Sequence, residues 1–162
     1  MGTLATLDST LRYELEVWTQ AAARSYFELV GEPLVEATGS FVLDAIEDAD
    51  FGLLIHNGGD DPVFQYGNRI ARALFEYGLA ELRELPSRYS AEEDLRDERA
   101  QMLAEAAASG LYKNYSGIRV AKSGRRFRIV DAIIWKVMDE QGETIGQAAR
   151  ILRTESLDSD AT

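Results

Sequence analysis

His56 is the only histidine of the chain, and the chain has no cysteine. Every acid–base, nucleophilic or metal-dependent scheme that uses an imidazole must therefore involve His56. The lack of cysteine excludes disulfides, thiolate metal sites and cysteine nucleophiles. Two interpretations of His56 stay open. Its imidazole hydrogen-bonds the following turn, or it faces a cavity and acts with Tyr66 or Asp61 in an isomerase or hydratase.

Asn68 and Arg88 are the next candidates for a binding role. Asn68 lies where a strand-like run gives way to a helical pattern, so its side-chain oxygen is suited to cap that helix. A direct contact with a ligand is the alternative. The guanidinium of Arg88 can hold a carboxylate or a phosphate through two hydrogen bonds. Alternatively, Arg88 pairs with Glu92 or Glu93 while Ser90 caps the next helix.

Aromatic and polar residues on the predicted strands can line a pocket, because binding pockets are mostly apolar with a few placed polar groups. Core packing explains the same aromatic residues equally well. Arg119 belongs to a basic hairpin that can bind an anionic ligand, meet acidic residues of a second subunit, or be solvated. The residues that we predict to contact a ligand are His56, Tyr66, Asn68, Ser87, Arg88, Tyr115, Arg119, Trp135 and Gln147.

Two groups of predicted strands must position these residues. Short apolar runs at 51–56 and 63–66 flank a turn rich in glycine and predict a hairpin. Loosely alternating runs at 112–121, 126–137 and 144–152 predict a three-stranded meander. Neither group is large enough to fold alone, so both must share one sheet.

Helical patterns precede, separate and accompany these strands. The expected fold is therefore α+β, a five-stranded antiparallel sheet with helices on one face and an N-terminal helical extension. We place the extension at 1–48, the sheet domain at 49–153 and a flexible acidic tail at 154–162. The predicted helices cover 9–30, 34–46, 68–77, 79–85 and 90–109.

The first predicted helix carries a single apolar stripe. This stripe packs either on the sheet of its own chain or on a second copy of the chain, and both possibilities stay open. Its residues recur at steps of three and four, namely Leu11, Leu15, Trp18, Ala22, Tyr26 and Leu29.

The composition fits one globular domain with an acidic surface. The chain has 162 residues, of which 46% are hydrophobic, and a net charge of −11. An acidic surface repels phosphates, so nucleic-acid binding is not expected. No apolar run approaches ~18 residues and no signal-peptide pattern occurs, so we expect no membrane contact and a cytoplasmic location. The neighbouring carboxylates lack the spacing of a metal site.

Five segments occur in a defined order along most of the chain: PVFQYGNR at 62–69, LPSRYSAE at 85–92, YSGIRV at 115–120, SGRRFRI at 123–129 and GQAA at 146–149. Together they resemble the MEKHLA domain, a PAS-like family. MEKHLA domains occur at the ends of plant homeodomain–leucine-zipper regulators and as stand-alone bacterial proteins, and this chain resembles the stand-alone form. The resemblance implies a PAS-like fold over 51–151, a regulatory or sensing role and no established catalysis.

The resemblance also allows the usual PAS cofactors to be compared with this sequence. Light-sensing flavin domains form an adduct with a cysteine, which this chain lacks, so that photochemistry is excluded. Non-covalent flavin has no positive signal. Haem-binding PAS domains usually supply a histidine from the helix before the last three strands, whereas His56 ends the first predicted strand. We therefore expect no cofactor.

Taken together, these patterns predict a sensory or regulatory domain that binds a small organic ligand or a regulatory protein and signals through a change in packing. A homodimer through the N-terminal helix or the sheet is expected. Two alternatives stay open. One is a small cofactor-independent isomerase or hydratase that uses His56, and the other is a structural dimeric interaction module whose pocket is filled by Trp135 and Phe127.

Overall fold

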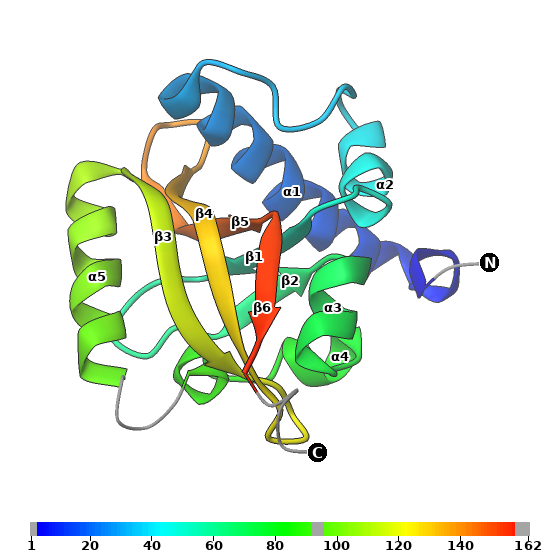
Figure 1. Ribbon diagram of the computed structural model, residues 1–162. Helices are drawn as coiled ribbons and strands as arrows, with labels where there is room; N and C mark the ends of the chain where they lie inside the picture. The colour runs from blue at the N-terminus through cyan, green and yellow to red at the C-terminus, as the bar shows by residue number, and fades with distance from the viewer. Residues whose placement is uncertain (1–2, 92–95, 158–162) are drawn as a thin grey trace.

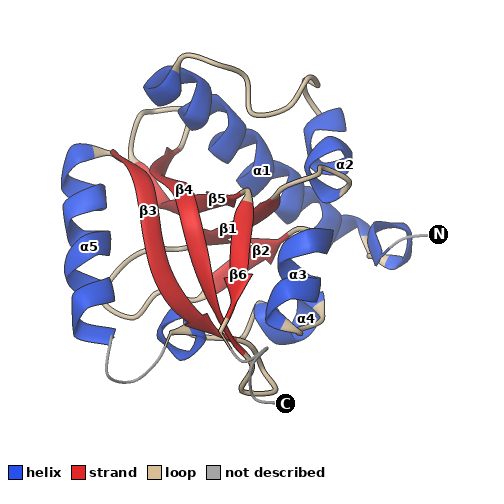
Figure 2. Cartoon of the chain, viewed as in Figure 1, coloured by secondary structure: helices blue, strands red, loops and turns tan. Residues whose placement is uncertain are grey.

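The computed structural model describes residues 3–91 and 96–157, without the side chains of 96–99, 103, 106 and 107. Its centre is an antiparallel sheet in the order β2-β1-β5-β4-β3 (Figure 2). The predicted hairpin is β1 with β2, and the predicted meander is β3, β4 and β5. The α+β class is therefore confirmed. The strands are β1 (Gly52–His56), β2 (Phe64–Gly67), β3 (Leu111–Val120), β4 (Arg126–Met138) and β5 (Thr144–Ile151).

A sixth strand, β6 (Arg153–Ser156), lies where the sequence predicted the start of a flexible tail. It pairs with the first part of β4. Because β4 has 13 residues and β5 only eight, the first part of β4 extends beyond the end of β5. The pair Val130 with Arg153 continues the register of the pair Ile133 with Arg150. The exposed backbone edge of β4 explains why a polar segment forms a strand here, since each of its residues can donate and accept in the ladder.

The helices surround the sheet on both faces (Figure 1). The second predicted helix is shorter than expected and begins only at Phe41, because Gly39 takes a left-handed φ of 58° that interrupts a helix. The proposed capping contact between Ser90 and Glu93 lies outside the described residues. The helices are α1 (Ser9–Val30), α2 (Phe41–Glu47), α3 (Arg69–Phe75), α4 (Leu79–Leu82) and α5 (Arg96–Ser109), with 3₁₀ turns η1 (Thr3–Thr6) and η2 (Ser87–Ser90).

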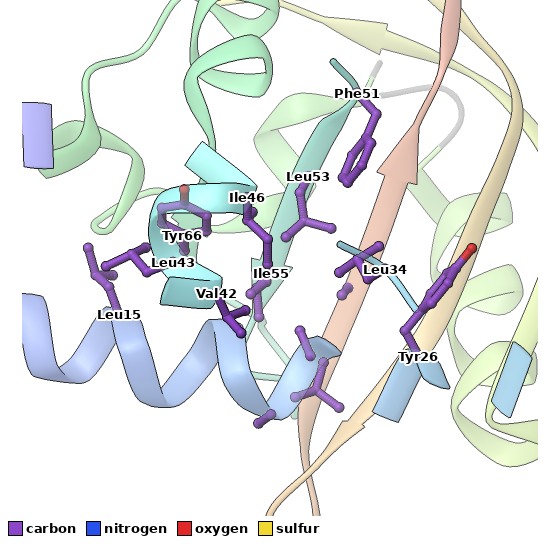
Figure 3. Packing of buried hydrophobic residues seen from close by; sticks show 14 of the residues in the cluster. Leu15, Tyr26, Leu34, Val42, Leu43, Ile46, Phe51, Leu53, Ile55 and Tyr66 are labelled. Atoms are coloured by element: carbon purple, nitrogen blue, oxygen red, sulfur yellow. The ribbon is translucent and has the colours of Figure 1, made fainter. Parts of the chain in front are cut away.

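The apolar stripe of α1 packs on the sheet of its own chain. Leu15, Ala22 and Tyr26 are buried, and the Tyr26 ring meets the Trp135 ring edge-on with centroids 4.8 Å apart. The Trp135 indole N–H donates to the Ala22 carbonyl at 3.0 Å. Figure 3 shows side chains of α1, α2 and β1 meeting in this layer. The N-terminal extension therefore covers the sheet face that the other helices leave open.

Two irregularities in the β3–β4 pair decide which side chains share a face. The register between Tyr115 and Gly117 shifts by one residue, because β4 places two residues opposite one of β3. Asp131, at this point in β4, has a left-handed φ of 57°, and Asn114 accompanies a second shift with a φ of 58°. Such bulges exchange the faces of all residues that follow. Trp135 consequently lies on the α1 face, although unbroken alternation from Phe127 would place both on one face.

Candidate ligand-binding cavity

A small cavity lies on the sheet face opposite α1. Its volume is about 40 Å³, which is room for about three water molecules. Apolar side chains of β1, β2, β4 and β5 form most of the wall, and η2 contributes Ser90. The lining residues include Leu54, Phe64, Ile129, Ala132, Ile134 and Ile151, with His56, Ser90, Tyr115, Arg119 and Gln147 as the polar members.

Arg119 brings a positive charge to this apolar wall. It lies near the end of β3 and is only 6% exposed. Its Nη1 donates to the carbonyl of its neighbour Ile118 at 3.1 Å, and its guanidinium carbon lies 5.2 Å from the centre of the Tyr115 ring. Among the described residues, no carboxylate forms an ion pair with Arg119. A buried charge without a counter-charge is costly, so this guanidinium is the least compensated group of the cavity.

Tyr115 and Gly117 create the space in which the guanidinium lies. A Cβ atom added at Gly117 would lie 2.2 Å from the Tyr115 hydroxyl oxygen. The Tyr115 ring therefore lies along β3, over Gly117 and toward Arg119. A ring within about 6 Å of a guanidinium attracts it through its negative face. The glycine thus allows the aromatic wall and the cation to approach each other.

His56 lies at the end of β1 and combines both interpretations that the sequence left open. The Gly58 backbone N–H donates to His56 Nδ1 at 3.0 Å, so the imidazole does bind the following turn. His56 also lines the cavity and is 8% exposed. Because Nδ1 accepts this hydrogen bond, the neutral imidazole carries its proton on Nε2.

Gln147 and Ser90 complete the polar part of the lining. Gln147 is paired with His56 across β1 and β5 and is 5% exposed. Ser90 was predicted only as a helix cap, yet it lines the cavity, and its hydroxyl donates to the Ser87 carbonyl at 2.7 Å. Ala91 forms an isolated antiparallel bridge with Arg119, which attaches η2 beside the cation. The turn η2 and Arg119 are therefore linked through the backbone.

Tyr66 and Trp135, two predicted pocket residues, belong to the opposite face of the sheet. Both are fully buried in the core cluster that contains Leu15 and Tyr26 of α1. The Tyr66 hydroxyl donates to Glu47 Oε1 at 2.8 Å. Burial, reinforced by the negative charge of Glu47, raises the pKa of Tyr66 far above its ordinary value. Neither residue lines the cavity, so we do not propose a ligand contact for them.

Asn68 is a structural residue whose hydrogen-bonding capacity is used completely. Its side-chain oxygen accepts from Ala71 N at 3.1 Å, as expected for a cap of α3, and from Leu53 N at 2.9 Å. Its amide nitrogen donates to the carbonyls of Ile46 and Phe51 at 2.9 and 2.8 Å. An amide side chain accepts two and donates two hydrogen bonds. Asn68 therefore has none left for a ligand.

Arg88 and Ser87 also lie apart from the cavity lining. The Arg88 guanidinium pairs with Asp61 on the protein surface and donates to the Tyr89 hydroxyl at 2.9 Å. The hydrogen bond to Asp61 raises the pKa of Arg88. Ser87 is completely buried, and among the described residues its hydroxyl has no hydrogen-bond partner. The predicted pairing of Arg88 with Glu92 or Glu93 falls outside the described residues.

Leu54, Phe64, Ile134 and Ile151 form the apolar wall that the sequence did not single out. The signal existed in β1, where Leu54 alternates with Leu53 and Ile55 of the opposite core. Of the predicted set, the structure brings together His56, Tyr115, Arg119 and Gln147.

Residues 16–155 match the model of the MEKHLA domain. The chain belongs to the MEKHLA domain family. The match begins within α1, so the matched region includes most of α1 and all of α2. None of the curated proteins compared with the chain matches it.

Solved structures that resemble this MEKHLA domain include PAS and light-oxygen-voltage domains. The PAS domain of a Colwellia psychrerythraea protein has a TM-score of 0.59 at 10% identity, with 70% of this chain and 92% of that chain covered. A light-oxygen-voltage domain studied with a flavin analogue has a TM-score of 0.53 at 14% identity, with 74% and 87% covered. An RNA-binding light-oxygen-voltage receptor has a TM-score of 0.60 at 16% identity, with 95% and 47% covered. At these identities the likeness shows a PAS-like fold.

Across residues 3–91 and 96–157, no helix has the length and apolar character needed to cross a membrane. In the same residues, no three His, Cys, Asp or Glu side chains are grouped as metal ligands.

Proposed function

We propose that this MEKHLA domain is a sensory module that binds a small organic molecule in the cavity between the sheet and η2. The observation that carries the proposal is the lining itself, in which a buried arginine, a histidine and a glutamine converge on an apolar wall. Ligand sites in proteins combine an apolar wall with a few placed polar groups in this way.

The sheet supplies a short path from the cavity to α1. Ile134 lines the cavity, while its neighbour Trp135 lies on the other face and binds Ala22 of α1. On β5, a Cβ atom added at Gly146 would lie 3.2 Å from the Trp18 ring and 2.1 Å from the His56 carbonyl oxygen. A ligand that favours one arrangement of these strands would therefore change the packing of α1.

A flavin fits this cavity poorly. Light-oxygen-voltage photochemistry needs a cysteine, which the chain lacks, and a volume of about 40 Å³ is far smaller than an isoalloxazine ring system. The small volume supports a ligand of only a few heavy atoms.

The alternative functions receive less support from the geometry. Tyr66 and Asp61, the expected catalytic partners of His56, bind Glu47 and Arg88 instead. A module with a filled pocket would need Trp135 beside Phe127, but Trp135 lies on the α1 face. A homodimer through α1 would have to use the outward residues Tyr13, Val17 and Phe27, which are 66%, 44% and 56% exposed. Light scattering of the purified protein tests that arrangement.

The proposal can be tested by filling the cavity. Ala132 is 1% exposed and lines it, so Ala132→Leu should occupy the space that the ligand needs. The matched control is Ala73→Leu on the exposed side of α3. Native mass spectrometry of freshly purified protein should show a retained small molecule in wild type and in the control, and its loss in Ala132→Leu. Equal retention in both variants would refute binding in this cavity.

A further inference from the structure

Resting on the proposed function, we infer that the ligand is a small monocarboxylic acid, bound as its carboxylate, and that Arg119 is its counter-ion. The short apolar tail of the acid lies against Leu54, Phe64 and Ile134.

The first argument is the comparison of Arg119 with Arg72, a largely buried arginine that lies outside the cavity. Arg72 donates to both carboxylate oxygens of Glu47, with Nη1–Oε1 and Nη2–Oε2 distances of 2.9 and 2.7 Å. Arg119 has an adjacent carbonyl and an aromatic ring but no carboxylate among the described residues. A guanidinium fork matches a planar carboxylate through two parallel hydrogen bonds. A carboxylate, which no described residue supplies to Arg119, is therefore the ligand group that the guanidinium favours.

The second argument is the balance of charge. Among the described residues that line the cavity, Arg119 is the only arginine or lysine, and none is an aspartate or glutamate. A monoanion brings this balance to zero, whereas a dianion such as a dicarboxylate or phosphate would leave one negative charge buried, at a high cost. The lining therefore fits one carboxylate and no second charge.

The third argument is size and polarity. The cavity holds about three water-sized groups, which favours the shortest acids, acetate before propionate and propionate before butyrate. Beyond the guanidinium, the polar members of the lining are His56, Ser90, Tyr115 and Gln147, while the rest of the wall is apolar. Acetate, propionate and butyrate match this combination.

Calorimetric titration of the full chain tests the inference with acetate, propionate and butyrate as probes. Propionamide serves as the neutral analogue of propionate, and inorganic phosphate serves as the compact polyanion. We expect at least one carboxylate to bind, and to bind more tightly than propionamide and phosphate. Equal binding of propionate and propionamide, or tighter binding of phosphate, would refute the carboxylate assignment.

Three arginine variants assign the role to Arg119. Arg119→Gln should weaken carboxylate binding by about tenfold to a hundredfold, the usual effect of losing a hydrogen-bonded charge. Arg119→Lys keeps the charge but loses the fork, so its affinity should lie between the two. Arg128→Gln is the control, because Arg128 lies on β4 and is 40% exposed. Thermal unfolding of each variant shows whether it is folded, and unchanged affinity in folded Arg119→Gln would overturn the proposal.

The failure of this inference differs from the failure of the proposed function. If no probe binds but native mass spectrometry shows another molecule that Ala132→Leu excludes, the cavity is a site and the carboxylate assignment is wrong. If neither a probe nor a retained molecule is found, both proposals are wrong.

Discussion

Arg72 and Arg119 are both largely buried, but they lie in regions of opposite character. Around Arg72, Glu47 of α2 binds Arg72 of α3 and Tyr66 of β2, so that every charge has a partner within the chain. Asn68 lies in the same region and uses all four of its side-chain hydrogen bonds. Around Arg119, the surrounding wall is apolar and offers no carboxylate among the described residues.

This difference separates a structural joint, formed by Glu47, Tyr66, Asn68 and Arg72, from the proposed binding site around Arg119. Polar groups that satisfy one another fix the relative positions of α2, β1 and α3, and they leave nothing for a ligand to complete. Arg119, which no described carboxylate neutralises, has the opposite property, since an added anion would complete it. The joint should therefore determine the stability of the protein, and the cavity should determine what it binds.

The largest expected effect comes from removing the centre of the joint. Asn68→Ala should lower the free energy of unfolding by about 3–5 kcal/mol, because it leaves two carbonyls and a strand N–H buried without partners. Urea denaturation measures this loss. The control is Asn57→Ala, in which the exposed Asn57 loses one hydrogen bond to Val63 N, with an expected cost of about 1 kcal/mol. Similar losses in both variants would contradict the special role of Asn68.

Breaking the ion pair of the joint should have the next largest effect. Glu47→Gln leaves the Arg72 guanidinium, with a side chain only 10% exposed, without its negative partner. The expected loss is about 2–4 kcal/mol in the same denaturation measurement. Glu81→Gln removes the exposed pair with Lys122 and should leave the stability unchanged within error. A comparable loss at both positions would mean that burial does not distinguish them.

Tyr66 tests the same joint through its response to alkali. Burial holds the pKa of Tyr66 above its ordinary value in the folded protein, while the unfolded chain releases this proton near pH ~10. The unfolded state therefore loses the proton first, and the stability contributed by neutral Tyr66 is lost as the pH rises above that value, by up to about 1.4 kcal/mol per pH unit.

Tyr66→Phe removes this proton and should show a weaker decline in stability above pH ~10. At neutral pH it should cost about 1 kcal/mol for the hydrogen bond to Glu47. Denaturation midpoints of both proteins at neutral and alkaline pH provide the measurement. Parallel decline in the two proteins would show that other groups cause the alkaline loss.

Local signals predicted the joint only in part. An asparagine between a strand and a helix predicts a cap, and the contact with Ala71 confirms it. The contacts of Asn68 with Ile46 and Phe51 depend on the placement of α2 against β1, which no local pattern contains. The hairpin, the meander and the α+β class followed from periodicity, because each predicted strand is short, apolar and bounded by turn residues.

Some of the predicted pocket residues line the cavity and others do not, for a physical reason. Trp135 was expected in the pocket, but the bulge at Asp131 moved it to the α1 face. A bulge needs only one residue with left-handed φ, and Asp in a β-rich run is a weak signal for it. Arg119 was included because of its charge, yet its burial depends on Gly117 and on the folded position of Tyr115.

The smallest expected effect has an unusual sign and concerns the stability of the ligand-free protein. Replacing a buried, uncompensated charge by an apolar side chain of similar length is neutral or stabilising. Arg119→Met in ligand-free protein should therefore raise the free energy of unfolding by about 0–1 kcal/mol. The matching substitution Arg72→Met should destabilise, because it leaves Glu47 buried without its cation. Addition of a short-chain carboxylate should stabilise wild type and leave Arg119→Met unaffected, since only wild type offers the counter-charge.

A clear destabilisation of ligand-free Arg119→Met, equal to that of Arg72→Met, would place Arg119 in the structural group and remove the contrast between the two regions.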